Sequence, residues 1–226
     1  MEKRKHLKEA VIILSGGLDS TVLTYYLKDK GYNLSAISFN YGQKHVKELE
    51  CALKTVIKLH LPYYEVIDIS TPMKQLKGSS ALLNPEIKMP QEHYTHSNQK
   101  QTVVPNRNMI MLSFAIGYAE AHKIKKVFYA AHKNDYTIYP DCRPEFVKVL
   151  NLASQKATYA KVEILAPFTN KLKSDLVKIG YNLNIPFEDT WSCYEGKDKA
   201  CGKCGTCQER LEAFKKNKLI DPIIYG

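Results

Sequence analysis

Short apolar runs alternate with amphipathic stretches along most of the chain, and this alternation predicts strands separated by helices. The runs consist of residues that are typical of strands buried on both faces of a parallel sheet. The predicted strands are residues 11–14, 33–39, 63–69, 126–131 and 162–165, and the predicted helices are residues 21–27, 46–60, 109–121, 144–157 and 171–179. Repeated strand–helix units predict an α/β fold with a doubly wound, mostly parallel five-stranded sheet.

In the second predicted helix, apolar residues recur every three or four positions, which indicates one buried face. These residues are Val46, Leu49, Leu53, Val56 and Ile57. Cys51 lies on the apolar side of the same helix and is therefore expected in the core.

The length of 226 residues suits one substantial core, so we expect a single α/β domain over residues 1–226. An irregular insertion at residues 70–104 holds several prolines and a polar run. Such an insertion is expected to form a lid over a site or a surface for a second subunit. The C-terminal segment, residues 188–226, holds most of the cysteines and is expected to bind a metal.

The formal net charge of +10 favours anionic partners such as nucleotides or RNA, although lysines on solvated helix faces also account for it. No apolar run approaches the roughly 18 residues of a membrane-spanning helix. The first nine residues are charged, and no signal-type apolar segment follows them. These features predict a cytoplasmic protein without a membrane partner.

The turn Ser15-Gly16-Gly17-Leu18-Asp19-Ser20 joins the first predicted strand to the first helix. Its glycines let the backbone approach a phosphate, and the free N–H groups and positive dipole end of the helix attract anions. Ser15 and Ser20 can donate hydrogen bonds to phosphate oxygens, while Asp19 can hold a magnesium ion or orient the loop. No lysine follows the glycines, so the turn is not a Walker A loop. An ordinary strand-to-helix turn is the alternative interpretation.

Two further polar segments, residues 40–45 and 132–144, leave predicted strand ends, where doubly wound sheets bind their ligands. In the second segment, Asp135, Asp141 and Arg143 can read the polar edge of a base-like ring. A tyrosine of the same segment, Tyr136 or Tyr139, can stack on the face of that ring.

Arg107 stands just before the third predicted helix. A guanidinium group pairs with phosphate or carboxylate in bidentate fashion, so Arg107 is either a clamp for such a group or a helix-surface residue. Cys142 is either a nucleophile or a buried thiol.

Four of the six cysteines crowd into a C-x7-C-x2-C-x2-C pattern formed by Cys193, Cys201, Cys204 and Cys207. In a chain without export signals, this spacing indicates a metal site rather than disulfides. Four thiolates suit a closed, structural zinc site, and an iron–sulfur cluster is the alternative. The glycines at 202 and 205 suit the tight turns that direct successive sulfurs inward.

The turn at residues 15–20 resembles the PP-loop, S-G-G-x-D-S, of the ATP pyrophosphatase group. Together with five further segments in the same order, it resembles the QueC family, the 7-cyano-7-deazaguanine synthases of queuosine and archaeosine precursor synthesis. The further segments are residues 41–45, 104–108, 139–146, 190–194 and 201–207. The resemblance covers residues 10 to 222 and departs from the usual family pattern at residues 130–132 and 137–138, beside the expected base pocket.

The resemblance implies an ATP-dependent ligase that forms C–N bonds. The carboxylate of 7-carboxy-7-deazaguanine would be activated by ATP and attacked by ammonia, and a second activation would convert the amide to the nitrile of 7-cyano-7-deazaguanine (preQ0). It further implies Mg²⁺ with the ATP, one structural Zn²⁺ and a homodimer, with no nucleic acid required.

The resemblance also assigns roles to individual residues. The catalytic residues would be Asp19, Ser20, Lys44 and Arg107. The ATP contacts would be Leu14, Ser15, Gly16, Gly17, Leu18, Asp19, Ser20, Thr21 and Phe39. The substrate contacts would be Tyr41, Gln43, His45, Asp135, Tyr139, Asp141 and Arg143, and the zinc ligands would be the four clustered cysteines.

Two rival functions are open to the sequence. One is a PP-loop enzyme that modifies tRNA directly, for instance by thiolation, and the net positive charge would suit it. The other is a zinc-ribbon module that binds nucleic acid and carries a degenerate nucleotide fold. No separate RNA-binding domain is visible, and the intact turn at residues 15–20 argues against a degenerate fold.

Overall fold

The computed structural model describes residues 8–43, 47–84, 86–91, 100–195 and 198–226. Its centre is a parallel sheet of five strands in the order β3-β2-β1-β4-β5. The strands are β1 (Lys8–Ile13), β2 (Tyr32–Asn40), β3 (Tyr63–Asp68), β4 (Lys126–Phe128) and β5 (Glu163–Leu165). The chain reverses its winding direction between β1 and β4, so the predicted doubly wound fold is confirmed.

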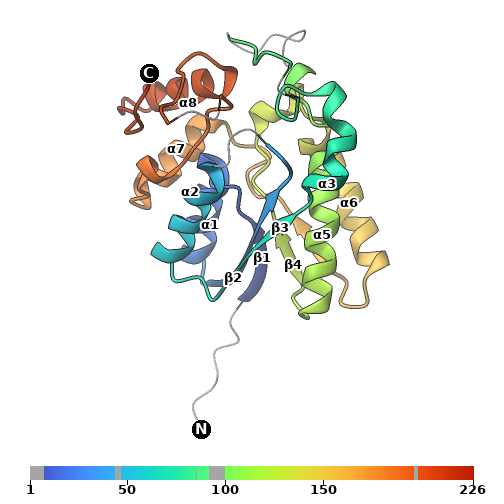
Figure 1. Cartoon of the computed structure of the whole chain (residues 1–226). Coiled ribbons are helices and arrows are strands. Elements are labelled where there is room, and N and C mark those ends of the chain that lie inside the picture. The colour runs from blue at the N-terminus through green and yellow to red at the C-terminus, as the bar shows by residue number, and fades with distance from the viewer. Residues whose placement is uncertain (1–7, 44–46, 85, 92–99, 196–197) are drawn as a thin grey trace.

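Helices cover both faces of the sheet (Figure 1). One face carries α1 (Leu18–Asp29), α2 (Lys47–Lys58), α7 (Lys173–Asn182) and α8 (Gly205–Lys216). The other face carries α3 (Ser70–Met73), α5 (Arg107–Ala121) and α6 (Pro144–Ala157). Successive residues of β1 point to opposite faces, so Ala10 and Ile12 pack with the α1 side while Val11 packs with the α5 side.

The predicted apolar face of α2 is wrong in part. Leu53 and Ile57 are exposed, whereas the buried positions of the helix are Cys51, Ala52, Thr55 and Val56. The backbone of α2 lies close to the turn after β1: a Cβ atom on Gly16 would stand 1.9 Å from the Glu48 carbonyl oxygen and 2.6 Å from the Ala52 nitrogen. Cys51 is in the core, as expected.

The described part of the insertion is less irregular than expected. It contains α3 and two short 3-10 helices at Lys74–Ser79 and Lys100–Thr102, and it buries Ala81 and Leu82 completely. Gln91 forms a bridge with Cys204, so the insertion contacts the C-terminal segment. Among the described residues, no helix combines the length and the apolar character that a membrane span requires.

Arg210, on α8, ties the end of the chain to the rest of the molecule. Its guanidinium is fully buried and makes a bidentate pair with Asp221, with N–O distances of 2.7 and 3.0 Å. It also donates to the backbone oxygens of Phe187 and Thr190. The hydroxyl of Tyr225 donates to the same Asp221 carboxylate.

We expect Arg210→Met to reduce the free energy of unfolding by about 3–5 kcal/mol, because it leaves a buried carboxylate without its cation. Urea unfolding followed by circular dichroism measures the change. The matched variant, Arg210→Met with Asp221→Leu, removes both charges and should recover part of the loss. A double variant as unstable as the sum of the single variants would contradict this explanation.

Candidate active site

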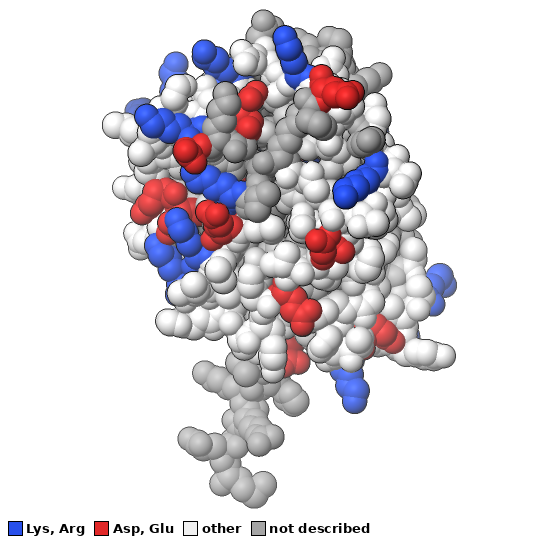
Figure 2. All heavy atoms as spheres, viewed as in Figure 1, with Lys and Arg blue, Asp and Glu red and all other residues white. Residues whose placement is uncertain are grey.

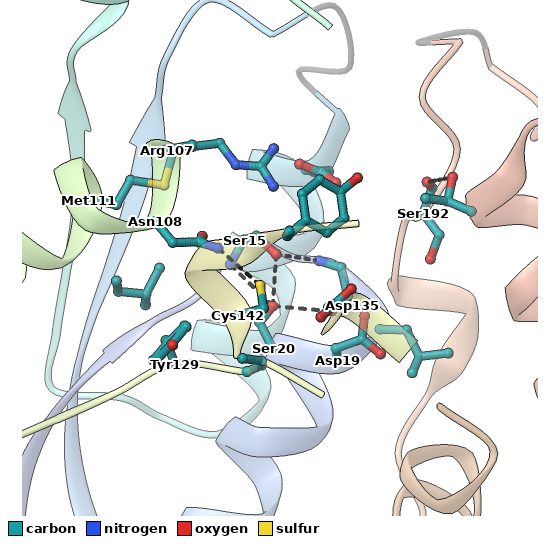
Figure 3. A pocket seen from close by; sticks show the side chains of 18 of the residues that line it. Ser15, Asp19, Ser20, Arg107, Asn108, Met111, Tyr129, Asp135, Cys142 and Ser192 are labelled. Atoms are coloured by element: carbon teal, nitrogen blue, oxygen red, sulfur yellow. Dashed lines mark hydrogen bonds between the residues drawn. The ribbon is translucent and has the colours of Figure 1, made fainter. Parts of the chain in front are cut away.

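A cavity opens where the connections after β1 and β4 part to opposite faces of the sheet. Its lining comes from segments far apart in the sequence: the turn after β1, the end of β2, the start of α5, residues 129–142, the start of α7, and residues 191–209. Figure 3 shows the labelled side chains of these segments around one space, with Arg107 and Met111 on one side and Ser192 on the other.

The turn after β1 is closed by its own serines. The Oγ atoms of Ser15 and Ser20 lie 3.0 Å apart, and the Ser15 N–H donates to Ser20 Oγ. The Gly17 N–H donates to Ser15 Oγ, while Ser20 Oγ donates to the carbonyl of Gly17. The N-cap of α1 is Gly17, which has no side chain that could compete for the helix N-terminus. The turn thus presents hydroxyls and a helix start to the cavity, as an anion site requires.

Gly16 is required by two independent constraints. Its φ of +82° lies in the left-handed region, which side chains disfavour. A Cβ atom there would stand 1.9 Å from the carbonyl oxygen of Glu48 in α2. Its own carbonyl accepts the N–H of Trp191, so the turn also meets the C-terminal segment.

We expect Gly16→Ala to lower the free energy of unfolding by about 2–4 kcal/mol and to abolish nucleotide binding, since φ strain adds to a backbone clash. Gly31→Ala is the matched control, because Gly31 has a φ of +79° but nothing within 4 Å of its Cβ position. That control should cost only about 1 kcal/mol. If the two variants lost the same free energy of unfolding in urea, the protein would relieve the clash between the new Cβ atom and α2 without an energetic cost, and the explanation would be wrong.

A cluster of charged groups surrounds Asp19. Its Oδ2 lies 3.3 Å from Lys173 Nζ and 3.4 Å from His132 Nε2. His132 also approaches Asp135 at 3.6 Å, and Lys173 approaches Glu209 at 3.4 Å. Asp19 and Asp135 lie close together in Figure 3.

Opposite charges in this cluster stabilise the ionised forms of Asp19 and Lys173. Although burial favours the neutral acid, Lys173 and His132 hold the pKa of the Asp19 carboxyl well below its usual value. Burial disfavours the charged ammonium of Lys173, but Asp19 and Glu209 raise its pKa above the usual range. Burial raises the pKa of Asp135. Asp19 is therefore an anion and Lys173 a cation at neutral pH.

The part of the cavity away from the turn after β1 contains aromatic side chains around the guanidinium of Arg107. The Arg107 guanidinium lies over the rings of Tyr41 and Tyr139 and donates to the Tyr41 hydroxyl at 3.3 Å. Burial raises the pKa of Tyr41 to about 12, so its hydroxyl stays neutral. Arg107 thus lines the cavity rather than the helix surface. Aromatic faces beside a guanidinium can hold a flat ring that carries an anionic group.

Most of the residues predicted to bind ligands meet in this one cavity. Those that line it are Leu14, Ser15, Gly17, Leu18, Asp19, Ser20, Phe39, Tyr41, Gln43, Arg107, Asp135 and Tyr139. Gly16 and Thr21 are not among the residues that line the cavity. Lys44 and His45 lie outside the described residues.

Three of the predicted substrate residues make hydrogen bonds to the backbone of the protein itself. Asp141 accepts the N–H of Asn108 at 2.9 Å and so caps α5, whose start positions Arg107. Arg143 donates to the carbonyl of Tyr136 and does not line the cavity. Gln43 lines the cavity, but its amide is bonded to the backbone of Phe39 and Tyr41.

The two other candidates in the segment after β4 also have partners. The Tyr136 hydroxyl donates to the carbonyl of Thr169, so Tyr139 rather than Tyr136 faces the cavity. Cys142 is buried and accepts a hydrogen bond from Asn108. Burial raises the pKa of its thiol, which disfavours the thiolate that a nucleophile needs.

The four clustered cysteines form a closed group of sulfurs. All four Sγ atoms lie within 4.8 Å of one another, and those of Cys201 and Cys207 are 4.0 Å apart. Zn–S bonds of about 2.3 Å place the sulfurs of a tetrahedral site about 3.8 Å apart. The N–H groups of Cys204 and Lys203 donate to Cys201 Sγ, as expected at a thiolate ligand. These residues could hold a metal ion.

The glycines beside the cysteines have different roles. Gly202, with a φ of +68°, makes the predicted tight turn. Gly205 instead begins α8, a helix that the sequence analysis did not predict.

The sequence analysis also missed Lys173, Glu209, Ser192 and Thr206, all of which line the cavity. Lys173 follows the end of β5, so the rule that ligands gather at strand ends could have identified it. The other three belong to the C-terminal segment that holds the cysteine cluster, and nothing in its pattern indicated that it forms a wall of the site.

Comparisons with known proteins agree with this architecture. The model of the family described as queuosine biosynthesis protein QueC matches residues 9–218. The 7-cyano-7-deazaguanine synthase of Pseudoalteromonas atlantica is 49% identical over 220 residues, which are 97% of this chain and 99% of the relative. The synthase of Caldicellulosiruptor bescii is 51% identical over 216 residues, which are 96% of each chain.

Among solved structures, an NMN synthetase from Francisella tularensis shares the fold, with a TM-score of 0.55 and 15% identity. The match covers 95% of this chain and 79% of that one. The family model matches most of the chain, and synthases that are about half identical in sequence match nearly its whole length, so this chain belongs to the QueC family.

Proposed function

We propose that this protein converts 7-carboxy-7-deazaguanine, ammonia and ATP to 7-cyano-7-deazaguanine. The observation that carries the proposal is the shared cavity, which is lined both by the glycine turn after β1 and by an arginine that lies over two tyrosine rings. The names of the relatives that match the whole chain support the same reaction.

The chemistry explains why both halves are needed. A carboxylate is a poor electrophile until ATP converts one of its oxygens to a leaving group. Ammonia then attacks the activated carbon and gives an amide. A second ATP activates the amide oxygen, and its loss with the two N–H protons leaves the nitrile. Holding nucleotide and carboxylate in one site supplies much of the rate through proximity.

Particular residues suit particular tasks. We assign the phosphates to the turn at residues 15–20 and to Lys173, and the carboxylate to Arg107. Tyr139 and Tyr41 offer faces for the deazaguanine ring, and Asp135 offers an acceptor for its N–H groups. Roles for Lys44 and His45 stay predictions from the family resemblance.

Two metal ions suit the residues present. Asp19 Oδ1 is buried without a hydrogen-bond partner among the described residues, so Asp19 could hold Mg²⁺. That ion would neutralise charge on the phosphates. The four cysteines suit one structural Zn²⁺, whose closed sulfur shell leaves no position for a catalytic water.

Free cysteine ligands also suit a reducing compartment such as the cytoplasm. We propose a homodimer on the family resemblance alone. On the face shown in Figure 2, lysines and arginines lie among acidic residues rather than in one continuous patch, in the part drawn in colour. This face therefore does not offer the continuous basic patch that would favour RNA binding.

The test is a mass-spectrometric assay of purified protein with ATP, Mg²⁺, ammonium and 7-carboxy-7-deazaguanine. We expect a nitrile product that requires both ATP and ammonium. If folded, metal-loaded protein makes no product from this substrate but modifies tRNA when ATP is present, the proposal is wrong and the tRNA-modifying alternative holds.

A further inference from the structure

A line of ionic contacts runs from the PP-loop turn to the metal-binding segment. Lys173 Nζ lies 3.3 Å from Asp19 Oδ2 and 3.4 Å from Glu209 Oε2. The three residues come from the start of α1, the start of α7 and the second turn of α8, and all of them line the cavity. The side chain of Lys173 is only 7% exposed, so these contacts are shielded from solvent.

Lys173 is the lysine that reaches the phosphate half of the cavity among the described lining residues. Arg107, the other cation of the lining, is bound to Tyr41 in the aromatic half. A lysine side chain has many rotamers, and its ammonium is useful to a phosphate only when it is held in one place. The backbone N–H of Lys173 is fixed by Asn134, but that bond does not set the direction of the side chain.

Glu209 is itself held in place by the structure of its segment. Cys207, two residues earlier, is one of the four clustered cysteines, and Cys204 precedes the first residue of α8. The Thr206 hydroxyl donates to the carbonyl of Ser192 at 2.8 Å, which joins the first turn of α8 to the cavity wall. The carboxylate of Glu209 therefore has a defined position relative to the phosphate turn.

We propose that Glu209 is a positioning residue: with Asp19, it holds the Lys173 ammonium beside the PP-loop turn so that the nucleotide phosphates find it in place. The inference rests on the proposed ATP-dependent function. It gives the metal-binding segment a part in nucleotide binding, through a side chain rather than through the metal.

The experiment measures the Kd of a non-hydrolysable ATP analogue with Mg²⁺ by calorimetry, on full-length, metal-loaded protein. Glu209→Ala should weaken binding about tenfold, because the ammonium loses one of its two charge-assisted hydrogen bonds. Glu209→Gln keeps an acceptor oxygen and should recover most of the affinity. Glu212→Ala is the control, since Glu212 is exposed on the same helix and outside the cavity lining.

Metal content and melting temperature are measured on the same samples and should match those of the wild type. In turnover, Glu209→Ala should raise the KM for ATP and leave the KM for the carboxylate substrate within about twofold. Unchanged or tighter analogue binding in Glu209→Ala overturns the inference. So does a loss accompanied by lower metal content or melting temperature, because it would show a structural role. If the wild type makes no nitrile, the proposed function fails, but the analogue still reports on Glu209.

Discussion

Replacing Asp19 with asparagine should lower nitrile formation by at least about a hundredfold, the effect of removing a charge aimed at the reacting groups. The variant is nearly isosteric but loses the anion that contacts Lys173 and His132. The unpartnered Oδ1, available for a magnesium ion, would become part of a neutral amide. Nucleotide phosphates would then meet a site that lacks the carboxylate we propose as the Mg²⁺ ligand.

The measurement is the single-turnover rate with saturating ATP and Mg²⁺. Asp29→Asn is the matched control, because Asp29 ends the same helix and its side chain is half exposed. The control should react at the wild-type rate. An Asp19→Asn variant that keeps more than a tenth of the wild-type rate would show that the carboxylate only orients the turn.

The second large effect is expected from loss of a metal ligand. Cys204→Ser should remove the metal ion that we propose for this cluster, and with it a contribution to folding that reaches roughly 10 kcal/mol in small zinc peptides. The effect should spread to the active site, because Trp191, Ser192, Tyr194, Thr206 and Glu209 line the cavity from the same segment. We expect both a lower melting temperature and loss of nitrile formation.

Elemental analysis, calorimetry and the product assay together measure this effect. Cys51→Ser is the control, because Cys51 is equally buried but lies in α2 away from the cluster. It should keep one metal ion per chain and lose only the small stability expected for a polar atom in the core. Full activity in a metal-free Cys204→Ser protein would show that the segment folds without its metal.

Local pattern was sufficient for the fold and for the phosphate turn. Strands β1 and β2 lie inside the parallel sheet and are largely buried, so their apolar runs stand out at residues 11–14 and 33–39 without knowledge of their neighbours. The turn at residues 15–20 needs a positive φ angle, which only glycine adopts without strain, and its serines and aspartate lie close together in the sequence. The cysteine spacing is likewise local, because a metal gathers ligands that are close in sequence.

Tertiary structure decided which polar groups share a site. Helix α2 meets Gly16 through the backbone of Glu48 and Ala52, and Leu53 and Ile57 are exposed, which the spacing of apolar residues did not predict. Asp141 caps a helix and Arg143 holds a loop, although both stand in a polar loop at a strand end. The sequence by itself therefore determined the family, the sheet and the phosphate turn. Only the folded chain brought Lys173 and Glu209 to Asp19, because contacts between residues so far apart in sequence depend on how the helices pack.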